Sequence, residues 1–227
     1  MKKRILSMVL ALSMLISFMP IIASAATSGT CGDNLTWTFD NGTLTISGTG
    51  EMKNYSGNLN QSAPWHSNIK SIKSVVIEKG VTNIGDYAFS WCNSLTSITI
   101  PNSVISIGRD AFDNCSSLTS ITIPNSITSI GYGAFEACSG LTSVTIPNSL
   151  TSISDSVFSR CDSLTSITIP NSITSIGSCT FSSCSSLTSI MIPSSITSIG
   201  SAAFSNCSSL TRITIPKSVT RIGYGTF

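Results

Sequence analysis

The chain has 227 residues, and only 10% of them are charged, with 12 lysines and arginines against 10 aspartates and glutamates. Globular proteins usually carry about a quarter charged residues, so serine and threonine hydroxyls must supply most of this surface. No cluster of basic residues follows the first four positions, which argues against nucleic acid or an anionic membrane as a partner.

The first 25 residues have the pattern of an export signal. Lys2-Lys3-Arg4 precede an apolar stretch, and Ala23-Ser24-Ala25 closes it with small residues. We expect residues 1–25 to be a Sec-type bacterial signal peptide that is cleaved near Ala25, and the mature protein to be secreted or on the cell surface. A membrane anchor helix is the alternative, but Pro20 and the small-residue site favour cleavage. After cleavage, nine basic residues face ten acidic ones, and we expect no membrane insertion.

Residues 26–71 form a lead-in that does not repeat. Apolar and polar residues alternate from Leu35 to Ile46 on both sides of Asn41-Gly42. This alternation is typical of strands, and Asn-Gly favours a two-residue hairpin turn. The segment is therefore predicted to be an N-terminal β-hairpin cap, with Ala63-Pro64-Trp65 in a loop that folds back onto it.

From residue 72 to 227 the sequence repeats every 23 residues. Six full units begin at residues 72, 95, 118, 141, 164 and 187, and a truncated seventh begins at 210. The repeating leucines are Leu95, Leu118, Leu141, Leu164, Leu187 and Leu210, and the repeating phenylalanines are Phe89, Phe112, Phe135, Phe158, Phe181, Phe204 and Phe227. One unit is too small to fold alone, so neighbours must stack as a solenoid. Because the last unit is incomplete, we expect the chain to be a fragment.

Within a unit, Ile98 and Ile100 alternate with Thr99, which predicts a short strand with inward isoleucines and outward hydroxyls. Gly108 is predicted to serve a turn that needs an unusual backbone angle. Ala111, Phe112 and Cys115 follow at helical spacing, which predicts one turn of helix. The expected fold is thus a β-rich leucine-rich-repeat solenoid, with short strands and a one-turn helix per repeat, stacked into a curved rod.

These units resemble the BspA-type, or treponemal-type, leucine-rich repeat of bacterial surface proteins. The resemblance covers residues 72–227 and includes Pro101 and Gly108 with their equivalents in later units. It implies a right-handed solenoid on a secreted or cell-surface protein, attachment to host matrix proteins or other cells, and no catalysis. Two departures are Ser154, which replaces the turn glycine, and Met191, which interrupts a threonine column.

Eight cysteines could suggest disulfides in an exported chain. Six recur at the repeat period: Cys92, Cys115, Cys138, Cys161, Cys184 and Cys207. Parallel stacking holds neighbouring Cβ atoms beyond disulfide range, so we expect a buried, reduced column. Cys179 is expected to be a semi-exposed free thiol, with a local disulfide as the alternative.

No residue pattern indicates a catalytic, cofactor-binding or metal site. His66 is the only histidine, and a general base or a Ser-His-Asp arrangement would have to use it. We interpret it instead as a polar residue that helps to seat the cap. Zinc needs convergent cysteine and histidine ligands at spacings that this chain does not have.

The outward residues of the predicted concave sheet are the candidate ligand-contact face. They are Ser97, Thr99, Ser120, Thr122, Ser143, Thr145, Ser166, Thr168, Arg212 and Thr214. The alternative is that these hydroxyls only keep a stacked surface soluble. Regular threonine columns also raise the possibility of an ice- or crystal-surface binder, which the serine mixture, the expected curvature, Arg212 and Met191 argue against.

The expected function is a non-catalytic adhesion or interaction module that binds an extracellular protein or glycan ligand. A structural stalk that displays a domain beyond Phe227 is the alternative, and an enzyme domain beyond that point is a third. The most variable slot of the repeat lies before the predicted helix. Its members are Asp86-Tyr87, Arg109-Asp110, Tyr132-Gly133, Asp155-Ser156, Ser178-Cys179 and Ser201-Ala202. We expect specific contacts to combine this rim with the hydroxyl face.

Overall fold

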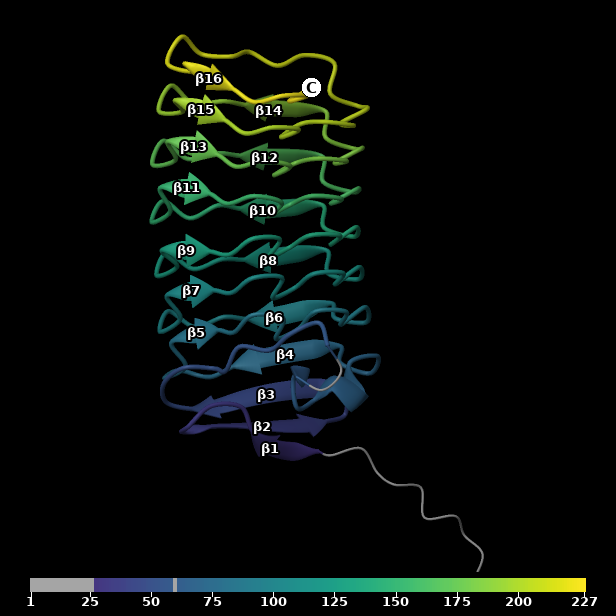
Figure 1. Cartoon of the computed structure of the whole chain (residues 1–227). Coiled ribbons are helices and arrows are strands. Elements are labelled where there is room, and N and C mark those ends of the chain that lie inside the picture. The colour runs from purple at the N-terminus through teal and green to yellow at the C-terminus, as the bar shows by residue number, and fades with distance from the viewer. Residues whose placement is uncertain (1–26, 59–60) are drawn as a thin grey trace, which may run out of the picture.

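The computed structural model describes residues 27–58 and 61–227, which form one column of stacked coils (Figure 1). The N-terminal cap lies at one end of the column and the last coil at the other. The predicted signal peptide, residues 1–25, lies outside the described residues. Within the described ranges, no helix is long and apolar enough to span a bilayer.

The cap contains the predicted hairpin. Strand β2 (Leu35–Asp40) pairs antiparallel with β3 (Thr43–Gly48), and β1 (Ser28–Thr30) pairs with β2 on the outer side. Asn41 and Gly42 form the turn with φ values of 47° and 84°, the left-handed backbone that a two-residue hairpin requires. A 3-10 turn, η2 (His66–Asn68), follows in the loop. The hairpin cap is therefore confirmed.

Each of the six full coils contributes two short strands and the last coil contributes one, and most of them pair in parallel with their neighbours. The first strands are β4 (Ser74–Ile77), β6 (Ser97–Thr99), β8 (Ser120–Thr122), β10 (Ser143–Thr145), β12 (Ser166–Thr168) and β14 (Ser189–Met191). The second strands are β5 (Asn83–Ile84), β7 (Ser106–Ile107), β9 (Ser129–Ile130), β11 (Ser152–Ile153), β13 (Ser175–Ile176), β15 (Ser198–Ile199) and β16 (Arg221–Ile222). Strand β3 pairs in parallel with β4, so the cap hairpin continues directly into the solenoid.

Stacked aromatic rings run through the core along the axis. Each repeat phenylalanine stacks on the next, with ring centroids 5.3 to 5.8 Å apart from Phe89 to Phe227. Trp65 of the cap loop extends this column, because its ring stacks on Phe89 at 5.7 Å and meets Trp37 edge-on at 5.9 Å. Trp65 is fully buried, so the cap closes the solenoid with an aromatic ring of its own.

The predicted one-turn helix is wrong. Residues 109–114 form successive turns, in which Asp110 and Asn114 have left-handed φ values of 49° and 57°. The backbone N–H groups of Asp110, Phe112 and Asn114 donate to the next coil at 2.8 to 2.9 Å, and Cys115 closes a local three-residue turn on Phe112. A helix would direct these N–H groups to its own carbonyls, so stacking with the neighbouring coil replaced the helix.

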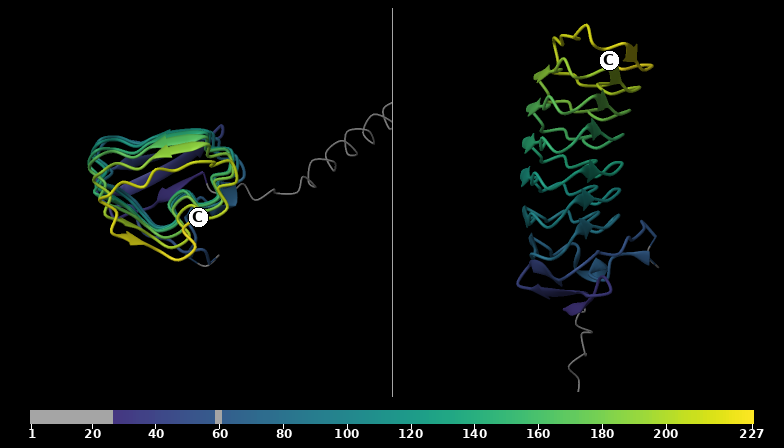
Figure 2. Two further views of the ribbon diagram at one scale, coloured as in Figure 1. Left: turned by 90° about the horizontal axis from the view of Figure 1, so that it is seen from above. Right: turned by 90° about the vertical axis from the view of Figure 1, so that its left-hand side faces the viewer.

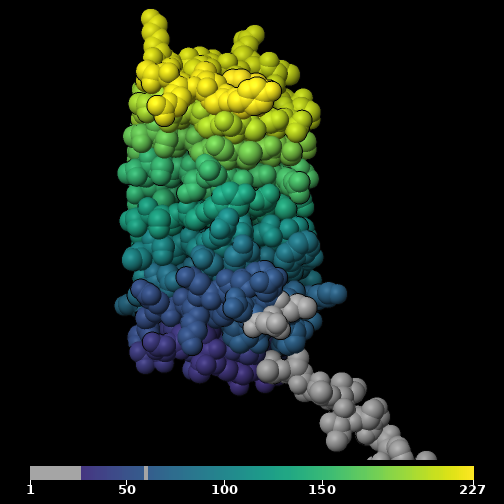
Figure 3. Space-filling model, in the orientation of Figure 1, coloured from purple at the N-terminus to yellow at the C-terminus, as the bar shows by residue number. Residues whose placement is uncertain are grey.

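The column is straight rather than curved, and its middle coils nearly superimpose when viewed along the axis, while the last coil is displaced from them (Figures 1 and 2). Helices pack about 8–10 Å apart, whereas hydrogen-bonded strands lie about 4.8 Å apart, and this mismatch is what would bend a solenoid with helices on one side. Here both sides are stacked by backbone hydrogen bonds at similar spacing. The outer surface is closely packed on the face seen in Figure 3.

The repeat glycine serves close approach and not an unusual angle. Gly108 and Gly131 do not have positive φ, but a Cβ atom on either would lie 2.6 Å from a backbone nitrogen of the preceding coil. Ser154 occupies this position in one coil, and there β9 and β11 belong to different sheets. The Ser154 hydroxyl donates to the Ile130 carbonyl at 2.6 Å, which is the kind of bond that the glycine N–H makes in other coils.

Candidate functional site

All ten residues of the predicted contact face are exposed. Neighbouring strands are in register, so Ser120 lies beside Ser143, and Thr145 lies beside both Thr122 and Thr168. The face is less continuous than expected, because β6 belongs to the cap sheet and β8 to the next one. Arg212 and Thr214 lie in no strand.

The threonine hydroxyls fall into two classes. Thr142 and Thr188, beside the first strands, donate their hydroxyls to a carbonyl of the preceding coil at 3.1 to 3.2 Å. Thr174 and Thr197, directly before the second strands β13 and β15, do the same. The outward hydroxyls of the central face have no such partner among the described residues: Thr122, Thr145 and Thr168. One class therefore stabilises the stack, whereas the other can bond to a ligand.

A groove of about 660 Å³ runs along the ends of β10, β12 and β14. Thr145, Thr168 and the 81%-exposed Met191 form one wall. The rest of the lining comes from the Ile-Pro corners and their polar neighbours: Ile146, Asn148, Ile169, Pro170, Asn171, Ile192, Pro193 and Ser194. The groove thus places free hydroxyls and amides beside apolar surface, a combination that suits binding.

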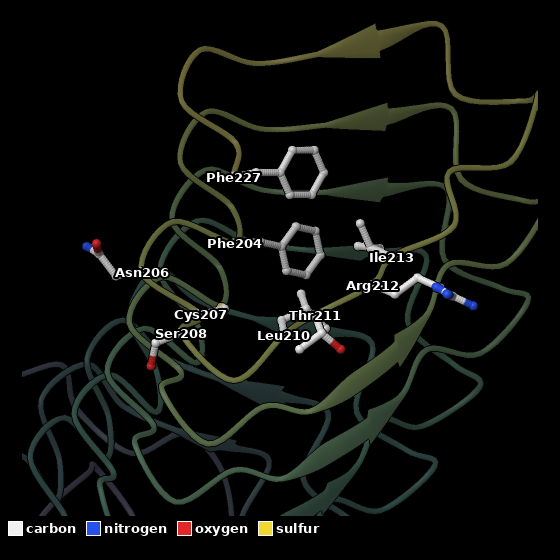
Figure 4. A pocket seen from close by; sticks show the side chains of 9 residues that line it. All are labelled: Phe204, Asn206, Cys207, Ser208, Leu210, Thr211, Arg212, Ile213 and Phe227. Atoms are coloured by element: carbon white, nitrogen blue, oxygen red, sulfur yellow. The ribbon is translucent and has the colours of Figure 1, made fainter.

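Arg212 lies apart from this groove. It borders a separate pocket of about 350 Å³ at the last coil, together with the rings of Phe204 and Phe227. Figure 4 shows the Arg212 side chain extending away from the two rings. The structure therefore divides the predicted face into a central hydroxyl surface and a separate cationic position. The straightness of the column removes the expected curvature as an objection to a surface-lattice binder, but Met191 still breaks the threonine column.

The variable slot lies on the turn edge of the coil, where its second residue has left-handed backbone. This is true of Tyr87, Asp110, Gly133, Ser156, Cys179, Ala202 and Gly225, with φ between 49° and 60°. Arg109 stacks over the Tyr132 ring at 4.7 Å and pairs with Asp110 at 3.4 Å. Burial raises the pKa of Asp113 and of Glu136, and repulsion from the Asp110 carboxylate raises both further. Charged and aromatic side chains therefore gather on this edge.

The column cysteines are buried free thiols, as expected. Each of the last five donates its Sγ–H to the phenylalanine carbonyl of the preceding coil, as Cys138 does to Phe112 at 3.2 Å. Burial raises the pKa of Cys138 to about 12. Such a thiol stays protonated and is a poor nucleophile. Cys179 is partly exposed and free.

The described residues contain no group of three or more His, Cys, Asp or Glu side chains arranged to hold a metal ion. His66 is exposed at the start of η2, and no ion pair found within residues 27–58 and 61–227 includes it. The candidate face and its groove offer hydrogen bonding through threonine hydroxyls and the Asn148 and Asn171 amides.

The family model for the BspA type leucine rich repeat region, in six copies, matches residues 65–165 and 105–227. This match covers most of the chain. The chain belongs to the BspA-type leucine-rich-repeat family.

Solved structures of bacterial leucine-rich-repeat proteins share this fold. A leucine-rich repeat protein from T. pallidum aligns with a TM-score of 0.62 and 24% identity, over 83% of this chain and 89% of the other. One from Bacteroides ovatus aligns with a TM-score of 0.59 and 26% identity, over 85% and 60%. One from Eubacterium ventriosum aligns with a TM-score of 0.52 and 19% identity, over 89% and 95%. A comparison with curated proteins gave no significant match.

Proposed function

We propose that this protein is a non-catalytic, secreted or cell-surface module that binds an extracellular protein or glycan through its hydroxyl face and the adjoining groove. The family and the predicted signal peptide support the location. The observation that carries the proposal is the free outward hydroxyl of Thr122, Thr145 and Thr168, beside neighbouring columns whose hydroxyls are used internally.

The groove supports the same assignment. Its Asn148 and Asn171 amides and the exposed Met191 give a ligand both hydrogen-bonding groups and apolar contact. Because the strands hold these groups in fixed register, little conformational entropy is lost when a ligand binds. The charged turn edge provides a second surface that can select among partners.

The test is binding of the purified chain to an array of matrix proteins, mucins and glycans. In the face variant, Thr122, Thr145 and Thr168 are all replaced by Val, which keeps shape and strand propensity but removes the hydroxyls. In the control variant, Val replaces Thr128, Thr174 and Thr197, each of which donates its hydroxyl to a carbonyl of the preceding coil beside the second strands. We expect the face variant to lose roughly tenfold or more in ligand affinity with no change in its free energy of unfolding. The control variant should keep its affinity but lose about 1 kcal/mol of the free energy of unfolding for each hydrogen bond removed.

Equal binding by the parent chain and the face variant would overturn the proposal. Absence of binding by a folded chain across the whole array would favour a structural spacer instead.

A further inference from the structure

A small cleft opens between the cap loop and the first turn segment of the solenoid. His66 and Ser56 border it on the cap side, and Tyr87, Ser90 and Trp91 border it on the solenoid side. Its enclosed space is about 50 Å³, which is enough for a few waters or one short substituent but not for a whole ring.

Trp91 differs from its equivalents in the later coils, none of which is aromatic. It is 55% exposed and has left-handed backbone with φ of 64°. The same slot holds Asn114, Ala137, Arg160, Ser183 and Asn206 in later coils, also with positive φ. A bulky residue at such an angle is unfavourable, and its exposed ring gains little from the hydrophobic effect. Strained, exposed residues of this kind concentrate at binding sites.

The surroundings of Trp91 are rigid. The Trp91 N–H donates to the Asp113 carbonyl at 2.8 Å, and the Tyr87 N–H donates to the Arg109 carbonyl at 2.8 Å. Across the cleft, the buried Trp65 ring donates through Nε1 to the Ala88 carbonyl at 2.9 Å. The solenoid wall of the cleft is therefore held in place before any ligand arrives, and the Trp65 bond ties the cap loop to it.

The lining carries hydroxyl, imidazole and aromatic groups but no carboxylate, ammonium or guanidinium group. Two carboxylates lie just behind the lining. Asp113 accepts a hydrogen bond from the Ser90 hydroxyl at 3.4 Å, and Asp110 hydrogen-bonds to the Tyr87 side chain. The lining itself offers no charged group as an ion-pair partner for a ligand. It matches a ligand that has both an apolar face and several neutral hydroxyls.

We propose that this cleft binds a neutral saccharide. One sugar ring lies against the exposed face of Trp91, where its C–H groups meet the aromatic π-surface. A single ring substituent, such as an acetamido methyl or hydroxymethyl group, enters the small enclosed space. The Ser56 hydroxyl and the His66 imidazole hydrogen-bond to ring hydroxyls around it. The Ser90 oxygen can accept from the sugar while its hydrogen bonds to Asp113, and the Tyr87 hydroxyl stays bonded to Asp110. This site is separate from the hydroxyl face, so its failure would leave the proposed function standing.

Titration of the full chain with chitotetraose and with cellotetraose tests the proposal, observed by saturation-transfer NMR and tryptophan fluorescence. Trp37 and Trp65 are 2% and 0% exposed, so Trp91 dominates the solvent-sensitive emission. We expect at least one sugar to bind, to shift this emission, and to protect it from acrylamide quenching.

The key variant is Trp91→Asn, because Asn occupies the same slot in two other coils at the same backbone angle. We expect its sugar affinity to fall at least about tenfold by NMR, while Trp91→Phe retains most of the affinity. Tyr132→Ala removes an exposed aromatic two coils away and should bind as the parent does. Binding unchanged in Trp91→Asn, or no binding of either sugar to the folded parent, overturns the proposal.

Discussion

The strand side and the turn side of each coil stack through the same kind of backbone hydrogen bond, yet their outward side chains differ. On the strand side, the Thr142 N–H donates to Thr119 of the preceding coil at 3.0 Å, and the outward residues are nearly all serine and threonine. On the turn side, the Phe112 N–H donates to Ala134 of the following coil at 2.8 Å, and the outward residues include charged and aromatic ones. The backbone holds both sides together, so the exposed side chains of the turn edge are free to vary.

The largest expected effect on stability comes from removing a core ring on the turn side. Phe135 is fully buried between Phe112 at 5.3 Å and Phe158 at 5.7 Å. Phe135→Ala should lower the free energy of unfolding by about 3–5 kcal/mol in urea titration, because it leaves a cavity in the ring column. Tyr132→Ala, on the exposed edge of the same coil, should change it by less than about 0.5 kcal/mol. Similar losses from both would show that the turn edge is not free to vary.

The next test is the close approach of coils at the repeat glycine. A Cβ on Gly177 would lie 2.6 Å from the Asp155 backbone nitrogen, so the coils must separate to admit it. Gly177→Ala should cost about 1–3 kcal/mol in the same titration. Gly57→Ala is the control, since its nearest neighbour would be 3.9 Å away. If both variants were equally stable, a side chain at the glycine position would not push the coils apart. The missing pairing between β9 and β11 would then have a cause other than Ser154.

The smallest expected effect is relief of strain on the turn edge. Ala202 has φ of 54°, a left-handed angle that glycine adopts without penalty. Ala202→Gly should raise the free energy of unfolding by about 0.5–1 kcal/mol and the Tm with it. Ala203→Gly, at the buried neighbour without positive φ, should lower both. Destabilisation by Ala202→Gly would show that this slot is not strained.

Several features followed from the sequence because they depend on local pattern. The 23-residue period, the Asn41-Gly42 turn and the alternation of inward isoleucine with outward hydroxyl each constrain the nearby backbone. The exposure of the contact face follows from the same alternation, since strand side chains point to opposite sides in turn.

Tertiary structure alone decided the rest, because a backbone N–H bonds to whichever carbonyl is within reach. The spacing of Ala111, Phe112 and Cys115 suits a helix or a series of turns equally well, and the carbonyls of the next coil selected the turns. Trp65 extends the ring column because the cap loop places its ring against Phe89. The 23-residue period alone does not indicate this contact. The separation of Arg212 from the groove, and the cleft beside Trp91, likewise exist only once the coils are stacked.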